Sequence, residues 1–314
     1  MTKIIDCTLR DGGHLNRWNF DINFAKELYI TAKKSGVDYF EAGYRNLKKD
    51  SSFGDFYSCN DDFLFSVFEN ISECRLSVMA DVGKTDLKLF RKCIPENTPV
   101  SLVRIASYPD RLNEAFELCE GIKNLGYDVI LNLMAIAKFS GKDFEKISEW
   151  ENKSVLTSVC FSDSFGSFLP NDVMKYHNIL KQAGFINISF HAHNNLQLAF
   201  ANSIIAADNN FFSVDGSACG LGRSAGITPT ELILWYLQKL RKDKYNPFPY
   251  IEFIFGNKEK FNSFSVENSV KAIIGGMKNL HPNYINELFE SNGNSVKDIL
   301  EMADIILKKG LISK

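Results

Sequence analysis

The feature that most constrains the fold is a regular alternation of short apolar runs with segments of helical spacing. Eight runs are rich in Val, Ile, Leu and Phe: Lys3–Cys7, Val37–Gly43, Leu76–Asp81, Val100–Ala106, Asp128–Ala135, Val155–Ser162, Ile186–His193 and Phe212–Ser217. Near-continuous apolar character is typical of parallel strands that are covered on both faces. Helical spacing occurs between them, in Phe24–Ser35, Leu87–Cys93, Leu112–Leu125, Val173–Ala183 and Leu196–Ala207. Eight alternating units predict an α/β protein built as a (β/α)8 TIM barrel.

The composition changes after a last helical pattern at Pro229–Arg241. The following stretch, Lys242–Pro249, holds two prolines and several charges and is typical of a linker. Beyond it, three segments have helical character, Val266–Ile274, Pro282–Ser291 and Ser295–Lys309, the last with Ser295 as N-cap. We therefore expect a catalytic barrel over residues 1–241 and a small C-terminal helical appendage over residues 242–314.

Charge and cysteine content exclude several classes of function. The chain has 36 Lys and Arg against 38 Asp and Glu, so it has no basic surplus for nucleic acid. Its apolar runs are shorter than the ~18 residues that a membrane span needs. Seven cysteines occur without a C-x-x-C pair, and the N-terminus has no signal-peptide pattern. These observations predict a cytoplasmic protein that acts neither on nucleic acid nor in a membrane.

Two histidines close the seventh apolar run, in Phe190-His191-Ala192-His193-Asn194-Asn195. In an extended strand, residues i and i+2 point to the same face, so both rings can approach one metal ion. The same pair is equally compatible with an ordinary strand end, in which one ring is hydrogen-bonded in the core and the other is solvated. The spacing alone leaves both interpretations open.

The first apolar run is followed by Thr8-Leu9-Arg10-Asp11-Gly12-Gly13-His14. Its glycines indicate a tight turn against a ligand, although Arg10 and Asp11 could equally form an exposed ion pair. In a TIM barrel the carboxyl ends of all strands meet at one mouth, which would bring Asp11 to His191 and His193. Two imidazoles and a carboxylate form a set with open positions, which suits Mn2+, Co2+, Zn2+ or Fe2+ without identifying the ion. Mn2+ is the ion we expect first, and Mg2+ is a further candidate.

Four motifs carry a family resemblance: Thr8–His14, His191–Leu196, Ala201–Ser203 and Gly220–Gly226. Together they resemble the DRE-TIM metallolyases, and most closely the 4-hydroxy-2-oxovalerate aldolase (HMGL-like) branch. The resemblance implies a metal-dependent class II aldolase that joins or cleaves a 2-oxo acid, such as pyruvate, and an aldehyde. It also implies that Asp11, His191 and His193 hold the metal.

The resemblance implies further roles for other residues. Arg10 would stabilise the enolate, and His14 would act as the general base on the 4-hydroxyl group. Substrate binding would fall to four residues, each with a plainer alternative: Glu41 as a supporting carboxylate, Asp163 and Ser164 as a helix cap, and Arg223 as a solvated loop arginine. From the C-terminal segment, Tyr284 or His281 would supply a proton to the enolate, unless His281-Pro282 simply begins a helix.

One departure and three alternatives accompany this interpretation. The glycine loop ends in Ala225-Gly226-Ile227 where the family has asparagine after the glycine, and Asn194 or Asn195 could compensate. The alternatives are a Claisen-type acyl-CoA synthase, a CoA-ester lyase and a non-catalytic subunit. Cys219 precedes the glycine loop rather than lying inside it, which disfavours the CoA-ester lyase. The expected partners are a 2-oxo acid, an aldehyde, an aldehyde dehydrogenase and further copies of the chain in a homo-oligomer.

Overall fold

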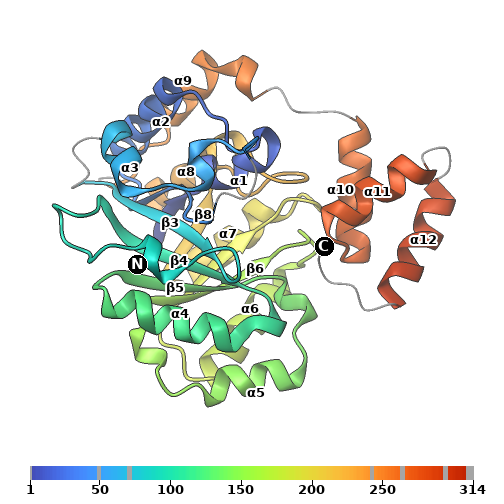
Figure 1. Ribbon diagram of the computed structural model, residues 1–314. Coiled ribbons are helices and arrows are strands. Elements are labelled where there is room, and N and C mark those ends of the chain that lie inside the picture. The colour runs from blue at the N-terminus through green and yellow to red at the C-terminus, as the bar shows by residue number, and fades with distance from the viewer. Residues whose placement is uncertain are drawn as a thin grey trace.

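Eight parallel strands form a closed barrel in sequential order (Figure 1). The computed structural model describes residues 2–47, 51–68, 73–240, 244–261, 266–292 and 296–308. The strands are β1 (Lys3–Asp6), β2 (Tyr39–Tyr44), β3 (Arg75–Asp81), β4 (Val100–Ser107), β5 (Asp128–Leu133), β6 (Ser158–Asp163), β7 (Ile188–Ala192) and β8 (Ser213–Gly216). Pairing of β8 with β1, from Lys3 opposite Ser213 to Asp6 opposite Gly216, closes the ring. The predicted TIM barrel is therefore confirmed.

Helices surround the barrel and continue beyond it. They are α1 (Thr8–Asn16), α2 (Ile22–Lys34), α3 (Asp61–Val67), α4 (Leu112–Asn124), α5 (Gly141–Glu149), α6 (Pro170–Gln182), α7 (Ala199–Asp208), α8 (Thr230–Leu240), α9 (Phe248–Gly256), α10 (Val266–Lys278), α11 (Pro282–Asn292) and α12 (Val296–Lys308). Short 3-10 turns lie at Asp55–Tyr57, Leu87–Leu89, Pro109–Arg111, Ile136–Lys138, Lys153–Val155, Ala218–Gly220 and Lys258–Lys260. No helix in these described ranges combines the length and apolar character of a membrane span.

The helical prediction for Leu87–Cys93 is wrong. The Asp86 side chain accepts a hydrogen bond from the Lys88 backbone and starts a single 3-10 turn. Phe90 then takes an extended conformation and buries its ring, 5% exposed. The capping bond and the burial of one aromatic ring therefore outweigh the helical spacing of this segment.

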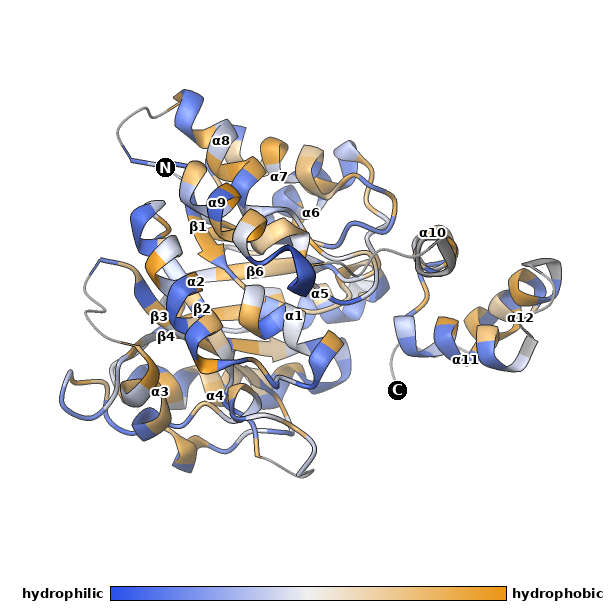
Figure 2. Cartoon of the chain, turned by 90° about the horizontal axis from the view of Figure 1, so that it is seen from above, coloured by the Kyte–Doolittle hydropathy of each residue, from blue (hydrophilic) through white to orange (hydrophobic). Residues whose placement is uncertain are grey.

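Two apolar clusters build the barrel domain, as the hydropathy colouring in Figure 2 illustrates. The larger cluster fills the layer between strands and helices, and the smaller one lies inside the barrel around Ile5, Leu102 and Ile130. Closer to the strand ends, the buried positions become polar, with Glu41 on β2, Arg104 on β4, His191 on β7 and Asp215 on β8. Buried polar groups need partners, so this layer marks where chemistry can be placed.

The expected glycine turn after β1 is instead the first turns of helix α1. The Asp6 carboxylate accepts from the Thr8 backbone nitrogen at 3.0 Å and starts the helix. The glycines serve packing, because a Cβ at Gly13 would overlap the Trp18 indole. Trp18 in turn donates from Nε1 to the Arg10 carbonyl at 2.9 Å. Close approach of an aromatic ring, rather than a turn, explains the glycine at this position.

The chain after α8 returns to the barrel before it continues into the C-terminal helices. Tyr245, within the stretch expected to be a linker, is buried, and its hydroxyl donates to Asp38 at 2.9 Å. Pro247 then precedes α9, which packs against α2 and α8. Helices α10, α11 and α12 enclose their own apolar cluster beside the barrel mouth. The expected boundary at 241/242 and the N-cap at Ser295 lie outside the described residues.

Candidate active site

Helix α1 carries three of the expected residues over the barrel mouth. Arg10 and Asp11 lie four and three residues before His14, so their side chains lie on the same side of the helix as that histidine. Arg10 and Asp11 are buried, and the Arg10 Nη1 lies 2.5 Å from the Asp11 carboxylate. The His14 ring reaches the open cavity beneath the helix. The sequence left open an exposed ion pair between Arg10 and Asp11. In the structure this ion pair is buried.

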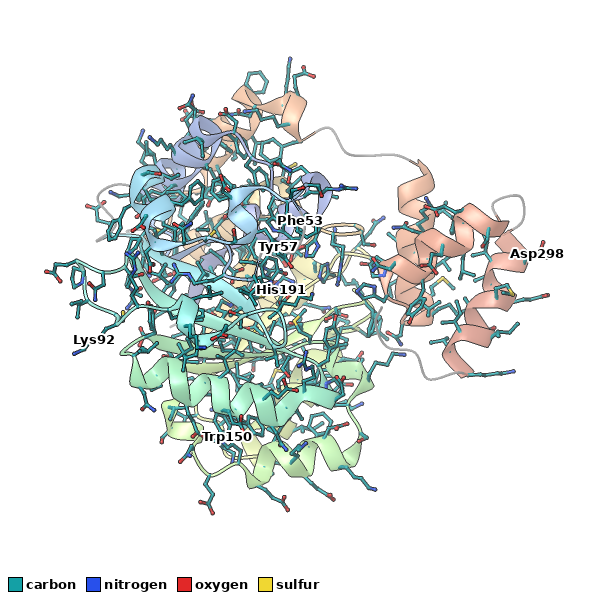
Figure 3. All side chains as sticks on the ribbon, in the orientation of Figure 1. Phe53, Tyr57, Lys92, Trp150, His191 and Asp298 are labelled. Carbon is teal, nitrogen blue, oxygen red and sulfur yellow. The ribbon has the colours of Figure 1, made fainter. Side chains whose placement is uncertain are left out.

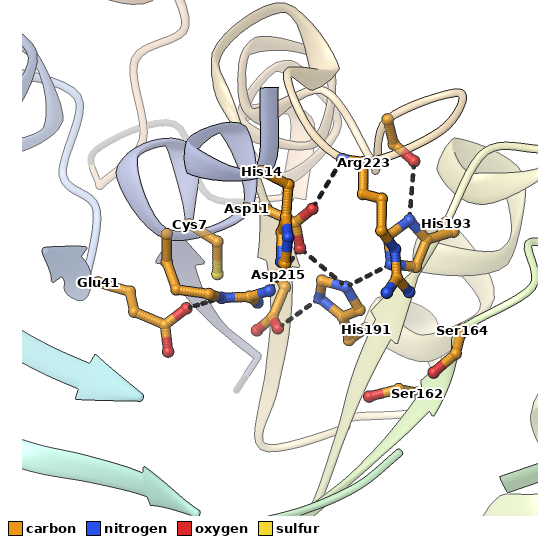
Figure 4. A network of polar contacts seen from close by, with 12 residues as sticks. Cys7, Asp11, His14, Glu41, Ser162, Ser164, His191, His193, Asp215 and Arg223 are labelled. Carbon is orange, nitrogen blue, oxygen red and sulfur yellow. Dashed lines mark hydrogen bonds and ion pairs between the residues drawn. The ribbon is translucent and has the colours of Figure 1, made fainter. Parts of the chain in front are cut away.

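The two histidines at the end of the seventh strand meet Asp11 at this place (Figure 4). Figure 3 shows where His191 lies in the whole chain. The Nε2 atoms of His191 and His193 are 3.4 Å apart, and His191 Nε2 is 3.5 Å from Asp11 Oδ2. All three side chains are buried. The structure thus brings together the three residues expected to bind a metal.

The hydrogen bonds of the His191 and His193 rings indicate which nitrogen of each ring has a free lone pair. His191 Nδ1 lies 2.8 Å from Asp215 Oδ2, and His193 Nδ1 lies 3.2 Å from the Gly226 carbonyl. Both partners are acceptors, so each Nδ1 carries the proton and each Nε2 presents a lone pair. Two lone pairs and a carboxylate oxygen facing one another repel unless a cation lies between them. The donor set therefore fits a divalent metal ion of the type that accepts nitrogen and oxygen ligands.

Ion pairs beneath the site connect Asp11 with Asp215, which holds the His191 ring. Asp215 bonds Arg104 at 2.5 Å, Arg104 bonds Glu41 at 3.2 Å, and Glu41 bonds Arg10 at 2.7 Å. With the Arg10 to Asp11 contact, the chain of pairs runs from Asp215 to Asp11. Three carboxylates and two guanidinium groups leave one negative charge, which a bound cation would balance.

These contacts move the pKa values of the ligands toward the metal-binding form. Burial opposes the charge of Asp11, but Arg10 outweighs it and holds the pKa of the carboxyl well below its usual range. Burial lowers the pKa of His193 well below that of free imidazole, so the ring is neutral. Burial also opposes the charge of Asp215, yet Arg104 and His191 lower its pKa to about 2. Protons therefore do not compete for Asp11 and His193 near neutral pH.

A cavity of about 340 Å³ opens beside the three ligands. Arg10, Asp11, His14, His193 and Arg223 lie on its wall. The pKa of His14 is lowered, mainly because the surrounding protein desolvates the imidazolium; Asp11 opposes this shift, and Arg223, Arg10 and Lys84 add to it. A neutral imidazole next to a metal site can accept a proton from a bound ligand.

Tyr44 joins this cavity because of an irregularity in β2. Glu41 pairs with Ser77 and Tyr44 with Met79, so β2 has one extra residue against β3. The bulge reverses the strand alternation and turns Tyr44 toward the cavity instead of the helices. Its hydroxyl oxygen lies 3.4 Å from His14 Nε2, and Trp18 packs edge-on against both rings.

Three residues expected to contact substrate lie away from the cavity walls. Glu41 is buried beneath the cavity, between Arg10 and Arg104. Asp163 accepts hydrogen bonds from the Ser167 and Phe168 backbone, and burial raises the pKa of its carboxyl to about 7. The Ser164 hydroxyl accepts from the Ala135 backbone at 2.9 Å. In this structure all three support the loops and ion pairs around the site.

The C-terminal segment contributes His281 rather than Tyr284. His281 lies on the cavity wall, where its Nε2 is 3.0 Å from the Arg223 Nη1. Tyr284 is 3% exposed and packs in the apolar cluster of the C-terminal helices. Helix α11 begins at Pro282, as the plainer alternative held.

Ile227 stands where the family pattern has asparagine, and here it fills apolar space instead of offering a polar side chain to the site. Ile227 is fully buried in the small cluster inside the barrel and pairs with His193 through the backbone. Neither neighbouring asparagine takes its place at the metal, since Asn194 caps the Ala199 backbone and Asn195 bonds Ser224 and the Ala272 carbonyl. In the described chain the candidate metal ligands are therefore three.

Asp215 and Tyr44 were missed by sequence reasoning. A single charged residue inside an apolar strand needs a buried partner, and this signal would have identified Asp215. Gly43, inside the second apolar run, is a signal for a bulge. Gly43 alone does not place Tyr44 at the cavity, because that placement also depends on the register of β2 with β3.

Comparisons with known proteins agree with this geometry. The 4-hydroxy-2-oxovalerate aldolase of Carboxydothermus hydrogenoformans is 28% identical over 243 residues, covering 76% of this chain and 71% of its own length. The enzyme of the same name from Serratia proteamaculans is also 28% identical over 243 residues, covering 76% of this chain and 72% of its own. Homologues of this chain are thus named aldolases.

Solved structures share the fold. The N-terminal domain of an aldolase candidate from Bacteroides vulgatus superposes with a TM-score of 0.79 at 26% identity, covering 96% of this chain and 99% of that one. An HMG-CoA lyase from Brucella melitensis superposes with a TM-score of 0.65 at 13% identity, over 83% of this chain and 99% of that one, and shows the fold alone. The HMGL-like family model matches residues 1–248. With its barrel, its motifs and this match, the chain belongs to the HMGL-like family.

Proposed function

We propose that the protein is a divalent-metal-dependent aldolase that cleaves or forms a 4-hydroxy-2-oxo acid. The observation that carries the proposal is the convergence of two unprotonated Nε2 atoms and the Asp11 carboxylate at a cavity that also holds Arg10 and His14. The names of the homologues support the same reaction class. The 2-oxo acid is expected to be pyruvate or a close relative.

Asp11, His191 and His193 would hold the metal, for which Mn2+ is our first candidate. When bound, the ion supplies Lewis acidity to the carbonyl group of the 2-oxo acid. Arg10 uses Nε for Glu41 and Nη1 for Asp11, and no described residue bonds its Nη2. That nitrogen is available to donate to the oxygen that becomes negative as the enolate forms.

His14 handles the proton of the cleavage step. Its neutral ring accepts the proton of the 4-hydroxyl group, the C3–C4 bond breaks, and the electron pair of that bond passes into the enolate of the 2-oxo acid. The hydroxyl carbon leaves as an aldehyde, and protonation of the enolate at C3 completes the reaction. Synthesis runs through the same steps in reverse, with His14 returning the proton.

A Schiff-base mechanism receives no support from the cavity. It needs a lysine whose amine is unprotonated near neutral pH. Lys84 is the lysine on the described cavity wall, and Asp81, at 3.1 Å, raises its pKa above the ordinary value. A protonated amine is not a nucleophile, so the metal-dependent route is favoured.

The decisive experiment combines chelation with substitution of the candidate ligands. We expect cleavage of 4-hydroxy-2-oxovalerate to stop after EDTA treatment and to return with Mn2+. Asp11→Asn and His191→Ala should abolish the activity that Mn2+ restores and should reduce Mn2+ bound per chain. His177→Ala, at a histidine outside the site, is the matched control. Activity that persists after exhaustive chelation would exclude the proposal.

Three further expectations belong to this proposal. All seven cysteines are free thiols, which supports a reducing, cytoplasmic location. A homo-oligomer and an aldehyde dehydrogenase partner are predictions from the family resemblance. Light scattering of the purified protein tests the first, and recovery of a dehydrogenase with the tagged protein from its own cells tests the second.

A further inference from the structure

Arg223 is half-buried and has no carboxylate partner for its guanidinium among the described residues. Ion pairs neutralise the buried arginines at positions 10, 45 and 104 and the more exposed arginines at positions 75 and 111. Among described residues the Arg223 guanidinium forms a hydrogen bond only with His281, and its Nε is buried without a hydrogen-bond partner. A half-buried cation that lacks a counter-charge favours an anionic ligand.

His281 does not neutralise this charge. Burial, followed by the neighbouring cations Arg223 and Lys84, lowers the pKa of His281 to about 3, so the ring is neutral. The neutral imidazole accepts at Nε2 from the Arg223 Nη1, 3.0 Å away, because a guanidinium group can only donate. The contact orients the guanidinium, and its full positive charge remains.

The backbone holds Arg223 beside the reacting centre. Its amide nitrogen donates to Asp11 Oδ1 at 3.1 Å, so the residue is anchored to a candidate metal ligand (Figure 4). Its side chain lies on the walls of two adjoining cavities, together with His14 and Asn283. Arg223 therefore stands where the cavity beside the metal ligands meets a second cavity.

The second cavity is a polar space of about 240 Å³ between the barrel mouth and the C-terminal helices. Its described lining includes no Asp or Glu. The polar side chains on its wall come from Asn195, Arg223, Ser224, Lys271, Asn283 and Asn286. Amide and hydroxyl donors beside the Arg223 guanidinium form a surface that favours phosphate or carboxylate groups.

We propose that this second cavity, with Arg223 at its entrance, binds an anionic group at the far end of the acceptor aldehyde. The substrate class is then an aldehyde with a phosphate or carboxylate group, and the product is a 4-hydroxy-2-oxo acid with a second, remote anionic group. The assignment of the anion to an aldehyde rests on the proposed aldolase function. Binding of an anion to this cavity does not require aldolase activity.

The first test measures binding without catalysis. Calorimetry with glycerol 3-phosphate as the probe, on protein treated with EDTA and on protein loaded with Mn2+, should detect binding in both. Arg223→Gln should weaken it by about 10- to 100-fold, the range for loss of a charged hydrogen bond. Arg91→Gln, which removes an exposed arginine paired with Asp62, is the matched control and should bind like wild type. Unchanged binding in Arg223→Gln would overturn the proposal.

The second test compares matched acceptors with pyruvate as the donor. Glyceraldehyde 3-phosphate is compared with glyceraldehyde, and succinic semialdehyde with butanal, so that the two pairs separate a phosphate site from a carboxylate site. We expect kcat/KM to favour at least one anionic acceptor by about 10-fold or more. Arg223→Gln should remove that preference, and Arg223→Lys should retain part of it. Both variants should keep the thermal midpoint of wild type.

The outcomes separate this proposal from the proposed function. Binding of glycerol 3-phosphate through Arg223 without any aldol activity would support the anion site and contradict the aldolase. Turnover of neutral aldehydes with equal loss for all acceptors in Arg223→Gln would contradict the anion site and support the aldolase. A raised KM for pyruvate alone would assign Arg223 to the donor and would overturn the proposal.

Discussion

The Nδ1 atom of His191 lies 2.8 Å from the Asp215 carboxylate, which also bonds Arg104 at 2.5 Å. This contact keeps the ring proton on Nδ1 and directs the Nε2 lone pair to the candidate metal site. A metal-binding histidine commonly depends on such a carboxylate for its orientation and basicity. Asp215 therefore supports the candidate site by orienting His191, although its own side chain is buried inside the barrel.

Asp215→Asn is expected to weaken Mn2+ binding by about 10- to 100-fold, because the amide no longer enforces the ring tautomer. It also leaves the buried Arg104 with one carboxylate instead of two, so the free energy of unfolding should fall by about 3 kcal/mol. Calorimetric titration with Mn2+ and urea denaturation measure the two effects. Asp208→Asn, which changes an exposed carboxylate bonded to Tyr236, is the control. Wild-type Mn2+ affinity in Asp215→Asn would contradict the assigned tautomer.

Gly13→Ala tests the packing that shapes helix α1. The added methyl group would overlap the Trp18 indole, which also packs against His14 and Tyr44. We expect a loss of about 1–3 kcal/mol in the free energy of unfolding, as for other overpacked interiors. Gly141→Ala is the control, since a Cβ at that helical position meets no atom within 4 Å. Equal thermal midpoints for the two variants would show that the indole moves without cost.

The barrel and the three candidate metal ligands could be predicted because their signals are local. Apolar strands covered on both faces have a recognisable composition, and the His-x-His spacing places both rings on one strand face. Helix α1 was hidden, because two adjacent glycines disfavour a helix interior by about 1 kcal/mol each. The reason for Gly13 lies in Trp18, whose contact becomes visible only in three dimensions.

Tyr44 and Arg223 show a second limit of sequence reasoning. The side chain of Tyr44 faces the cavity only because β2 has one residue more than β3 between two paired positions. The sequence shows Gly43 but does not show which residues of β3 pair with those of β2. Likewise, the free charge of Arg223 depends on which residues surround its guanidinium, and nothing in its loop reveals that no described carboxylate forms an ion pair with that group.

The pH dependence of cleavage follows from the pKa of His14. Desolvation by the cavity walls and repulsion by Arg223 and Arg10 lower this pKa, with Asp11 opposing. A base with a lowered pKa stays unprotonated to lower pH, so the acid limb of kcat/KM should lie below the value of 6.5 for free imidazole. His14→Asn should remove that limb and reduce cleavage by about 100-fold or more.

The same variant separates the two halves of the reaction. Exchange of the pyruvate methyl protons with solvent deuterium requires the metal ligands and Arg10, and it does not require a base at the 4-hydroxyl group. We therefore expect His14→Asn to retain this exchange, followed by NMR, while cleavage is lost. Cleavage at wild-type rate in His14→Asn would exclude this histidine as the base.

Removal of the hydroxyl group is expected to slow the enzyme at Tyr44, which lines the cavity, and not at Tyr284, which does not. Tyr44→Phe removes a hydroxyl 3.4 Å from His14 Nε2 and keeps the ring that packs on Trp18, so kcat should fall by about 10-fold with little change in the thermal midpoint. Tyr284→Phe changes a side chain buried among the C-terminal helices, so kcat/KM should stay within about 3-fold of wild type. Steady-state kinetics with 4-hydroxy-2-oxovalerate measures both. A large loss in Tyr284→Phe with an unchanged Tyr44→Phe would mean that α11 moves during turnover and brings its tyrosine to the substrate.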